Sequence, residues 1–507
     1  MTPNSTPRPR PTTHDTARDD SVSGDAARSG SLVSSITTPD YLAAELRRPP
    51  TTRRYHVRYP PGGNDPVPNR STRTAATSGR ESVDVVGLAA KSKRDLVVDL
   101  ARVFCVFAVV MMHSLMVGLY RNGDAIGQIN PLQTQSWFAL ATWVGQIMPL
   151  FFVVGGFAGA VSWRSAMRRG TTPGEFLRTR LVRLLRPALP LLVFLTVVLW
   201  VLVLCGVDRG VVDIVAAGVG MPLWFLAAFI SCQAFLPIMH GWHVSRPGST
   251  IATLVALSVI VDAARILSGI QEIGLLNLVF VWLAVQQLGF FYADGWFARR
   301  ARWQLAAGAV ASYALLAVLT YALDIYPVDM LTNLNPATVP LILLGVAQVC
   351  ILHLLYPLLR VAMTLKPVLI ATFFVGSRAM TIYLWHLPII VALSGGLFLS
   401  GWVDSVPGSG AWWATRPLFV VAVWLILGAL SLAVVRWERP AKAALEGLRD
   451  PGTVRIRVAA LLAFAVFVAE IQWGWSLLLL TLTAAVIAVA LRLVTPGREV
   501  TVNAQPS

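Results

Sequence analysis

Two histidines lie inside apolar stretches of the sequence, where ionisable side chains are rare. His113 ends the stretch VVDLARVFCVFAVVMMH, and His386 ends the stretch GSRAMTIYLWH. An imidazole titrates near neutral pH, so it can take a proton from a hydroxyl as that hydroxyl attacks a carbonyl. Ionisable groups at such positions are costly unless they face protein or water. We therefore interpret His113 as a candidate base or transient acyl carrier; a histidine bonded to a neighbouring helix is the alternative.

Asp99 and Arg102 precede His113 on the same apolar segment and lie one helical turn apart. His113 follows Arg102 by eleven residues. At a rise of 1.5 Å per residue, the histidine lies about 16 Å deeper than the arginine. We group Asp99 and Arg102 with His113 as candidate catalytic residues, and expect the Asp99 and Arg102 pair to hold the inner mouth of the site.

A cluster of arginines without lysine occurs in the stretch EFLRTRLVRLLRPALP. Guanidinium groups bind phosphate in a forked geometry that an ammonium group cannot copy. We therefore interpret Arg178, Arg180 and Arg183 as candidate ligands for the phosphates of an anionic donor. The alternative is a positive loop that only orients the neighbouring helices.

Tyr383 and Trp385 accompany His386, and Tyr383 shares a helix face with the histidine at a spacing of three residues. We treat Tyr383, Trp385 and His386 as a candidate acceptor-binding group. An aromatic belt at the membrane interface explains the tyrosine and the tryptophan equally well. It does not explain His386, for which a structural role is the alternative.

The elements that carry these residues are predicted to be transmembrane helices. Of the 507 residues, 55% are apolar and only 13% are charged, whereas about a quarter of the residues in soluble proteins are charged. Runs of about 20 apolar residues can cross a hydrocarbon core of about 30 Å. Twelve apolar segments lie near residues 96–120, 137–161, 187–205, 219–240, 250–268, 274–293, 304–323, 337–359, 378–399, 415–435, 457–473 and 475–492. The predicted fold is an all-α polytopic transmembrane helical bundle.

Composition divides the chain further. Residues 1–90 are rich in Pro, Ser, Thr, Arg and Gly, and such a segment cannot bury enough apolar surface to offset its ordering entropy. We predict a disordered basic cytoplasmic tail at 1–90, a membrane core of about ten helices at 91–436, a cytoplasmic basic loop at 437–456, an extra helix pair at 457–492 and a cytoplasmic tail at 493–507.

The basic residues recur at regular places along the chain. The formal net charge is +16, and the arginines concentrate in the loops after alternate apolar segments. The positive-inside rule then predicts a multi-pass protein of the cytoplasmic membrane with both termini in the cytoplasm. Membrane lipids are expected partners. Nucleic acid is not expected as a partner, because the basic residues are not gathered on one surface. The four cysteines form no CxxC pair, so we expect no metal and no tightly bound cofactor.

The order of these motifs resembles the acyltransferase family 3 of bacterial integral-membrane O-acyltransferases, over roughly residues 94–436. The family has D-x-x-R and then His in its first helix, FF-x-x-SGF, an R-x-R loop, LWFL and a late Y-L-W-H. This chain has Asp99, Arg102 and His113, then FFVVGGF at 151–157, Arg178 and Arg180, LWFL at 223–226 and YLWH at 383–386. It departs from the family at Gly155, where Ser is usual, so no acyl-serine can form there.

The resemblance implies a ten-helix core, to which the C-terminal pair is added. It also implies a membrane O-acyltransferase that uses acyl-CoA, with acetyl-CoA as our first expectation, and a carbohydrate or glycolipid acceptor at the outer side. The sequence leaves open the acyl chain, the acceptor, direct transfer versus an acyl-enzyme, the role of the tail and the oligomeric state.

Two other classes compete with this interpretation. A lipid-linked substrate flippase or transporter would use intramembrane polar residues as a path, and the candidates are Asp262, Arg265, Gln286, Gln287 and Glu470. The unrelated membrane-bound O-acyltransferase class also uses an intramembrane histidine but lacks the ordered motifs. Neither His113 nor His386 is followed by Asp five residues later, as an HxxxxD signature would require, and no Walker or GxSxG signature is present.

Overall fold

A computed structural model describes residues 95–122, 125–401, 405–434, 445, 448 and 450–496. All of them belong to one compact unit, Glu81–Ser507. The predicted tail at 1–90 lies outside the described residues. So do most of the predicted basic loop at 437–456 and most of the segment at 493–507.

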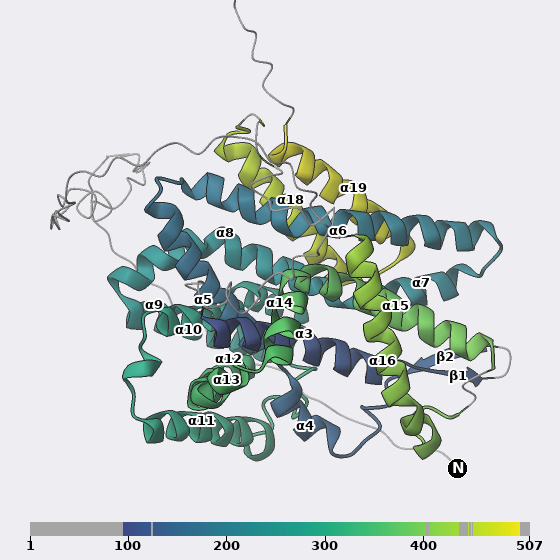
Figure 1. Ribbon diagram of the computed structural model, residues 1–507, viewed down its shortest axis with the longest axis horizontal. Coiled ribbons are helices and arrows are strands. Elements are labelled where there is room, and N and C mark those ends of the chain that lie inside the picture. The colour runs from purple at the N-terminus through teal and green to yellow at the C-terminus, as the bar shows by residue number, and fades with distance from the viewer. Residues whose placement is uncertain are drawn as a thin grey trace, which may run out of the picture. The chain divides into compact units, whose positions relative to one another are not determined.

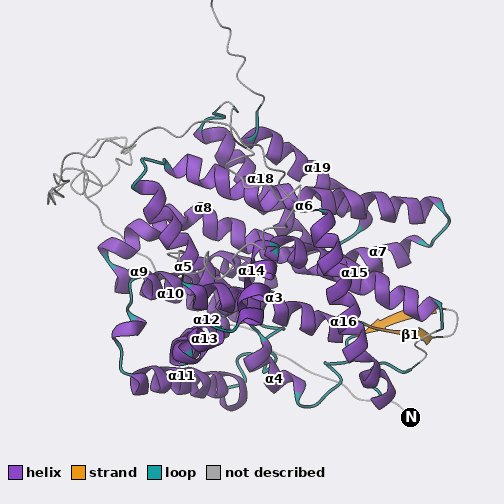
Figure 2. Cartoon of the chain, in the orientation of Figure 1, coloured by secondary structure: helices purple, strands orange, loops and turns teal. Residues whose placement is uncertain are grey.

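The described residues are almost entirely helical (Figure 2). The α-helices are α3 (Leu96–Met116), α4 (Phe138–Gly145), α5 (Met148–Met167), α6 (Pro173–Leu204), α7 (Arg209–Gly220), α8 (Trp224–Ser245), α9 (Pro247–Ser268), α10 (Asn277–Ala293), α11 (Arg302–Ala317), α12 (Val339–Leu354), α13 (Tyr356–Ala362), α14 (Lys366–Ser377), α15 (Ala379–Leu399), α16 (Gly410–Ala433), α18 (Thr453–Trp473) and α19 (Leu477–Val494). Three short 3₁₀ helices lie at Met221–Leu223, Gln271–Leu276 and Phe297–Arg299, and a π-helical turn at Val318–Ala322 follows α11. The strands β1 (Gly118–Asn122) and β2 (Ala125–Ile129) form an antiparallel hairpin in which Gly118 pairs with Ile129.

The predicted fold class is confirmed. Within the described part of the chain, ten helical segments are long and apolar enough to cross a membrane, and the bent pair α12 and α13 brings the number to eleven. Only α19 among these segments follows the core, so the core itself has nine segments and the bent pair. The expected C-terminal pair consists of α18 and α19, and α18 begins at Thr453, inside the predicted loop.

Three expectations about local structure were wrong. The arginine stretch near Arg178 is not a loop but the first part of α6, which starts with a capping box formed by Thr172 and Glu175. The stretch at 206–218, which separates two of the predicted apolar segments, is not a simple loop but contains most of α7. The first apolar helix ends at Met116, and the chain then turns into β1. Hydropathy alone does not separate a helix from a short strand at its end.

Helix α10 occupies the centre of the bundle and packs against α5, α8, α9 and α12 (Figure 1). Its contact with α5 is a backbone contact. A Cβ added at Gly156 would lie 2.2 Å from the carbonyl oxygen of Gln286, and one added at Gly289 would lie 2.1 Å from that of Val153. The absence of a side chain at these two positions lets the two backbones meet.

Helices α3, α15 and α16 pack together through a separate apolar cluster, which includes Val110 on α3, Leu387 on α15 and Phe419 on α16. Asp95 is the N-cap of helix α3, and its carboxylate accepts hydrogen bonds from the amides of Val97 and Val98. This packing fixes the position of His113 near the end of α3 relative to α15. The C-terminal helices α18 and α19 pack on α8 and α6 (Figure 1).

Candidate active site

The structure brings together the two histidines that the sequence singled out. Nε2 of His386 lies 3.0 Å from Nδ1 of His113, and the ring centroids are 4.9 Å apart. His386 is completely buried, with 0% of its surface exposed. Sequence analysis placed the two residues in different groups, one for catalysis and one for acceptor binding. The packing of α3 on α15 joins them into one pair.

Their hydrogen-bond partners assign the tautomer of each ring. Nδ1 of His386 contacts the backbone carbonyl of Tyr383, and a carbonyl oxygen can only accept. In a neutral His386 the proton therefore sits on Nδ1, and Nε2 accepts. His113 must then donate from its own Nδ1. Nε2 of His113 keeps its lone pair, which is the feature that a base or a nucleophile needs.

The other motifs gather around this pair as aromatic rings. The ring of Tyr383 lies 5.6 Å from that of His386 and 4.9 Å from that of Phe225, measured between centroids. Phe225 in turn contacts Phe151 at 5.1 Å. The FFVVGGF, LWFL and YLWH blocks thus meet in space. Trp385 lies elsewhere and contacts Phe194 at 5.2 Å, so the predicted acceptor group does not form one surface.

Asp99 and Arg102 form an ion pair on their own helix, with 2.8 Å between Nη2 of Arg102 and Oδ1 of Asp99. Arg102 lies beside α14, where a Cβ added at Gly376 would be 3.6 Å from its guanidinium. About three turns of α3 separate this pair from His113. Neither side chain reaches the histidine pair. The contacts of Asp99 and Arg102 therefore do not support grouping these two residues with His113 as catalytic residues. Their role at the inner mouth stays a prediction.

The three candidate donor-binding arginines have different surroundings. Arg178 is only 8% exposed, and its Nε donates to the backbone carbonyl of Val494 at 2.8 Å. It thereby fastens the end of α19 to α6, a packing role that the sequence did not suggest. The guanidinium of Arg180 lies over the ring of Phe176 at 4.7 Å, and Arg183 is exposed.

A second histidine cluster, missed in the sequence, joins the ends of α5, α8 and α10. His243 places Nδ1 at 2.9 Å from Oε1 of Gln287 and Nε2 at 3.0 Å from Oδ2 of Asp294. Arg164 bonds to the other oxygen of Asp294 and, at 3.1 Å, to Nε2 of His240. Burial raises the pKa of Asp294, but the bonds and charges of Arg164 and His243 outweigh this effect and hold the pKa below its usual value. The signal was available as HGWH, two histidines spaced three residues apart on α8.

Asp262, a candidate for a transport path, is a structural anchor. It is 1% exposed, and its carboxylate accepts hydrogen bonds from the side chains of Asn277 and Tyr326 and from the backbone amide of Val339, each at 2.9 Å. These donors come from α10, from the segment after α11 and from the start of α12. A carboxylate satisfied in this way holds helices together.

The other residues considered for a transport path each take part in a separate local contact. Arg265 donates to Gln271 at 3.1 Å, and Gln286 donates to the carbonyl of Cys232 at 3.2 Å. Gln287 belongs to the His243 cluster, and Glu470 accepts from Thr483 between α18 and α19. No continuous polar path joins them among these contacts. In the described part of the chain no three His, Cys, Asp or Glu side chains are placed to hold a metal ion.

Comparison with known proteins assigns the membrane core. A family model described as an acyltransferase domain matches residues 95–435, which is well over half of the chain. A search of curated proteins and a search of solved structures each found no match. The match covers the histidine pair, the aromatic blocks and the arginines of α6, and leaves out α18 and α19. The chain is a multi-pass membrane acyltransferase and belongs to the acyltransferase 3 family.

Proposed function

We propose that this acyltransferase transfers an acyl group, with acetyl as the first candidate, from cytoplasmic acyl-CoA to a hydroxyl. The acceptor is an extracytoplasmic or membrane-linked carbohydrate or glycolipid. The observation that carries the proposal is the contact between His113 and His386, because it leaves a nitrogen lone pair beside the motifs that define the family. The arginine distribution supports the sidedness through the positive-inside rule.

In the proposed step, Nε2 of His113 accepts the proton of the acceptor hydroxyl as its oxygen attacks the thioester carbonyl. The new C–O bond forms, the C–S bond breaks, and the imidazolium returns its proton to the departing CoA sulfur. The products are an ester and free CoA. His386 acts as a positioning residue, because it holds Nδ1 of His113 and thereby directs Nε2.

The donor phosphates are proposed to bind at Arg180 and Arg183 at the start of α6. Guanidinium groups suit this task because they bind phosphate oxygens in pairs. Arg178 is assigned to α19 instead, since its Nε already donates to Val494. Arg183→Gln should raise the KM for acyl-CoA and leave the KM for the acceptor unchanged, whereas Arg178→Gln should chiefly lower the thermal stability.

The test is reconstitution of the full chain in proteoliposomes with acetyl-CoA and an extract of envelope lipids and glycans. Release of free CoA, together with an ester identified by mass spectrometry on one extract component, supports the proposal. Acceptor movement across the bilayer without thioester loss would instead support the transporter class. The intact mass of the protein after exposure to acetyl-CoA alone reports whether His113 carries the acyl group or only removes a proton.

A further inference from the structure

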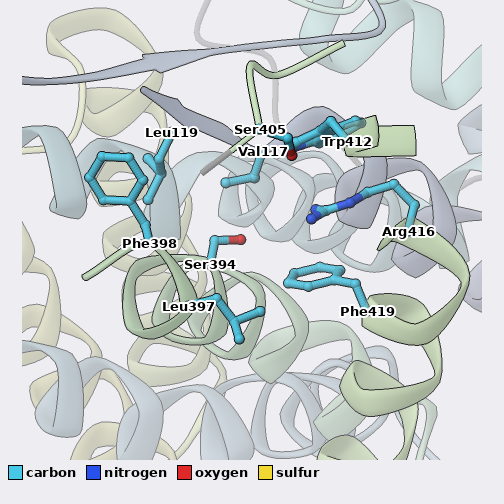
Figure 3. Close-up of a pocket in the computed structure, with 9 residues that line it drawn as sticks. All are labelled: Val117, Leu119, Ser394, Leu397, Phe398, Ser405, Trp412, Arg416 and Phe419. Carbon is cyan, nitrogen blue, oxygen red and sulfur yellow. The ribbon is translucent and has the colours of Figure 1, made fainter. Parts of the chain in front are cut away.

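A pocket lies where α3 and β1 meet α15 and α16 (Figure 3). Its empty space of about 310 Å³ includes the part that is open to solvent. Its lining residues are Val117, Leu119, Ser394, Leu397, Phe398, Ser405, Trp412, Arg416 and Phe419. None of them belongs to the histidine pair or to the motifs that the sequence singled out.

The pocket contains a buried guanidinium. Arg416 is only 5% exposed, and its charged group lies between two aromatic rings, 4.1 Å from the centroid of Trp412 and 4.4 Å from that of Phe419. Its Nε and Nη2 donate to the hydroxyl of the adjacent Thr415 at 3.2 Å and 3.0 Å. No carboxylate of a described residue forms an ion pair with it. A buried charge without an opposite charge is costly, so an anion bound here would be favoured.

Two hydroxyls in the same pocket have no partner among the described residues. The Oγ atoms of Ser394 and Ser405 are both buried and unbonded. Figure 3 shows the Ser394 hydroxyl and the Arg416 guanidinium pointing toward one another across the pocket. Buried polar atoms nearly always find a hydrogen-bond partner. A ligand with oxygen atoms would satisfy both hydroxyls and the guanidinium at once.

The pocket is close to the histidine pair along two helices. Val117 follows His113 by four residues on the chain, which corresponds to about 6 Å along the axis of α3. Ser394 follows His386 by eight residues on α15, or about 12 Å. A group bound at Arg416 would therefore lie about one or two sugar units away from an acceptor hydroxyl at His113.

We propose that this pocket binds an oxyanion, a carboxylate or a phosphate, of the molecule that receives the acyl group. The guanidinium donates to two oxygens of the anion in a forked geometry, and the hydroxyls of Ser394 and Ser405 complete the site. The inference rests on the proposed function, because it names a chemical class for the acceptor. It predicts that acidic glycans or phosphate-bearing glycolipids are acylated in preference to neutral ones.

The test uses ligand binding by the purified full chain in detergent, which needs no acyl transfer. Sodium glucuronate and glucose 1-phosphate are the probes, methyl glucoside is the neutral control, and chloride keeps the ionic strength constant. Binding is measured from the ligand dependence of the thermal midpoint. At least one anionic probe should bind better than methyl glucoside, and the better probe tells a carboxylate site from a phosphate site.

Variants locate the binding. Arg416→Gln should weaken the better probe about 10- to 100-fold, the range expected when a charged hydrogen bond is lost. Arg416→Lys keeps the positive charge and serves as the control for misfolding. It should weaken binding of the same probe less than Arg416→Gln does. Arg209→Gln removes an exposed arginine at the start of α7 and should change nothing. Equal binding of the neutral sugar, or unchanged binding in Arg416→Gln, would overturn the inference.

Two further outcomes separate this inference from the proposed function. Asp404 directly precedes Ser405 in the sequence and lies outside the described residues, so Asp404→Asn is included. Anion binding that appears only in Asp404→Asn would overturn the inference, because the wild-type site would then already be neutralised. Turnover of acyl-CoA with no selective anion binding would reject the oxyanion site and leave the proposed function intact. Selective binding without turnover would support the site and count against the function.

Discussion

His243 and His386 are both almost completely buried, with 1% and 0% of their surfaces exposed, and each lies on a helix of the membrane bundle. His243 uses both ring nitrogens on fixed neighbours, Gln287 and Asp294. His386 also uses both ring nitrogens, one on the carbonyl of Tyr383 and the other on His113, but its bond to His113 occupies only Nδ1 of that second imidazole. One cluster therefore has no lone pair to offer, and the other has one on Nε2 of His113.

The difference shows that burial alone does not identify a functional histidine. The His243 cluster contains the opposite charges of Arg164 and Asp294, and such a network fastens helix ends together. In the described residues, no carboxylate bonds to the pair of His113 and His386. The number of ring nitrogens already bonded separates a structural cluster from one that can move a proton. The predictions below test this distinction.

The largest effect is expected for His113→Gln. Loss of a general base lowers turnover by about 10²- to 10⁴-fold, and glutamine keeps the side chain polar and similar in size. We expect acyl transfer to fall within or below that range, while the protein remains folded in the membrane. Turnover is measured as CoA release per folded protein. A rate within a few-fold of wild type would exclude a base at this position.

His386→Phe should have a smaller effect. It removes the acceptor for Nδ1 of His113 but leaves the base in place, so turnover should fall about 10- to 100-fold with little change in the KM for acyl-CoA. If His386 acts only through His113, the double variant His113→Gln with His386→Phe should be no slower than His113→Gln alone. Additive losses would assign His386 an independent role.

His243→Ala should show the opposite pattern. It removes the partner of Oε1 of Gln287 and of Oδ2 of Asp294, which should destabilise the protein by about 1–3 kcal/mol and lower the thermal midpoint. Turnover per folded molecule should stay within about twofold of wild type, because the hydrogen bonds of His243 go to Gln287 and Asp294 and not to the histidine pair. A fully stable variant with lost turnover would remove the distinction between the two clusters.

The smallest effect is a pH dependence of stability. The pKa of Asp294 is held below its usual value, so its contribution is complete above the unfolded value of about 3.9. That contribution is lost as the pH falls below this value toward the folded pKa. The thermal midpoint should therefore decline in this acid range, and Asp294→Asn should make the decline shallower. An identical acid decline in the variant would show that Asp294 does not contribute.

Local sequence signals were sufficient for most of the helices and for the candidate status of His113 and His386. Apolar runs and arginine positions do not say which helices pack together, so the pairing of residues 113 and 386 could not be predicted. The same limit explains Arg178, whose partner Val494 lies 316 residues later. Asp262 resembled a path residue because its partners Tyr326 and Val339 come from a distant part of the chain.

The most direct test of the central claim is the tautomer of His113. Solid-state NMR of the full chain with isotope-labelled histidine in lipid separates the two ring nitrogens, and His113→Gln and His386→Phe assign the signals. We predict a protonated Nδ1 and an unprotonated Nε2 on His113, with a hydrogen-bond contact from Nδ1 to Nε2 of His386. A proton fixed on Nε2 of His113, or no contact between the rings, would contradict the account.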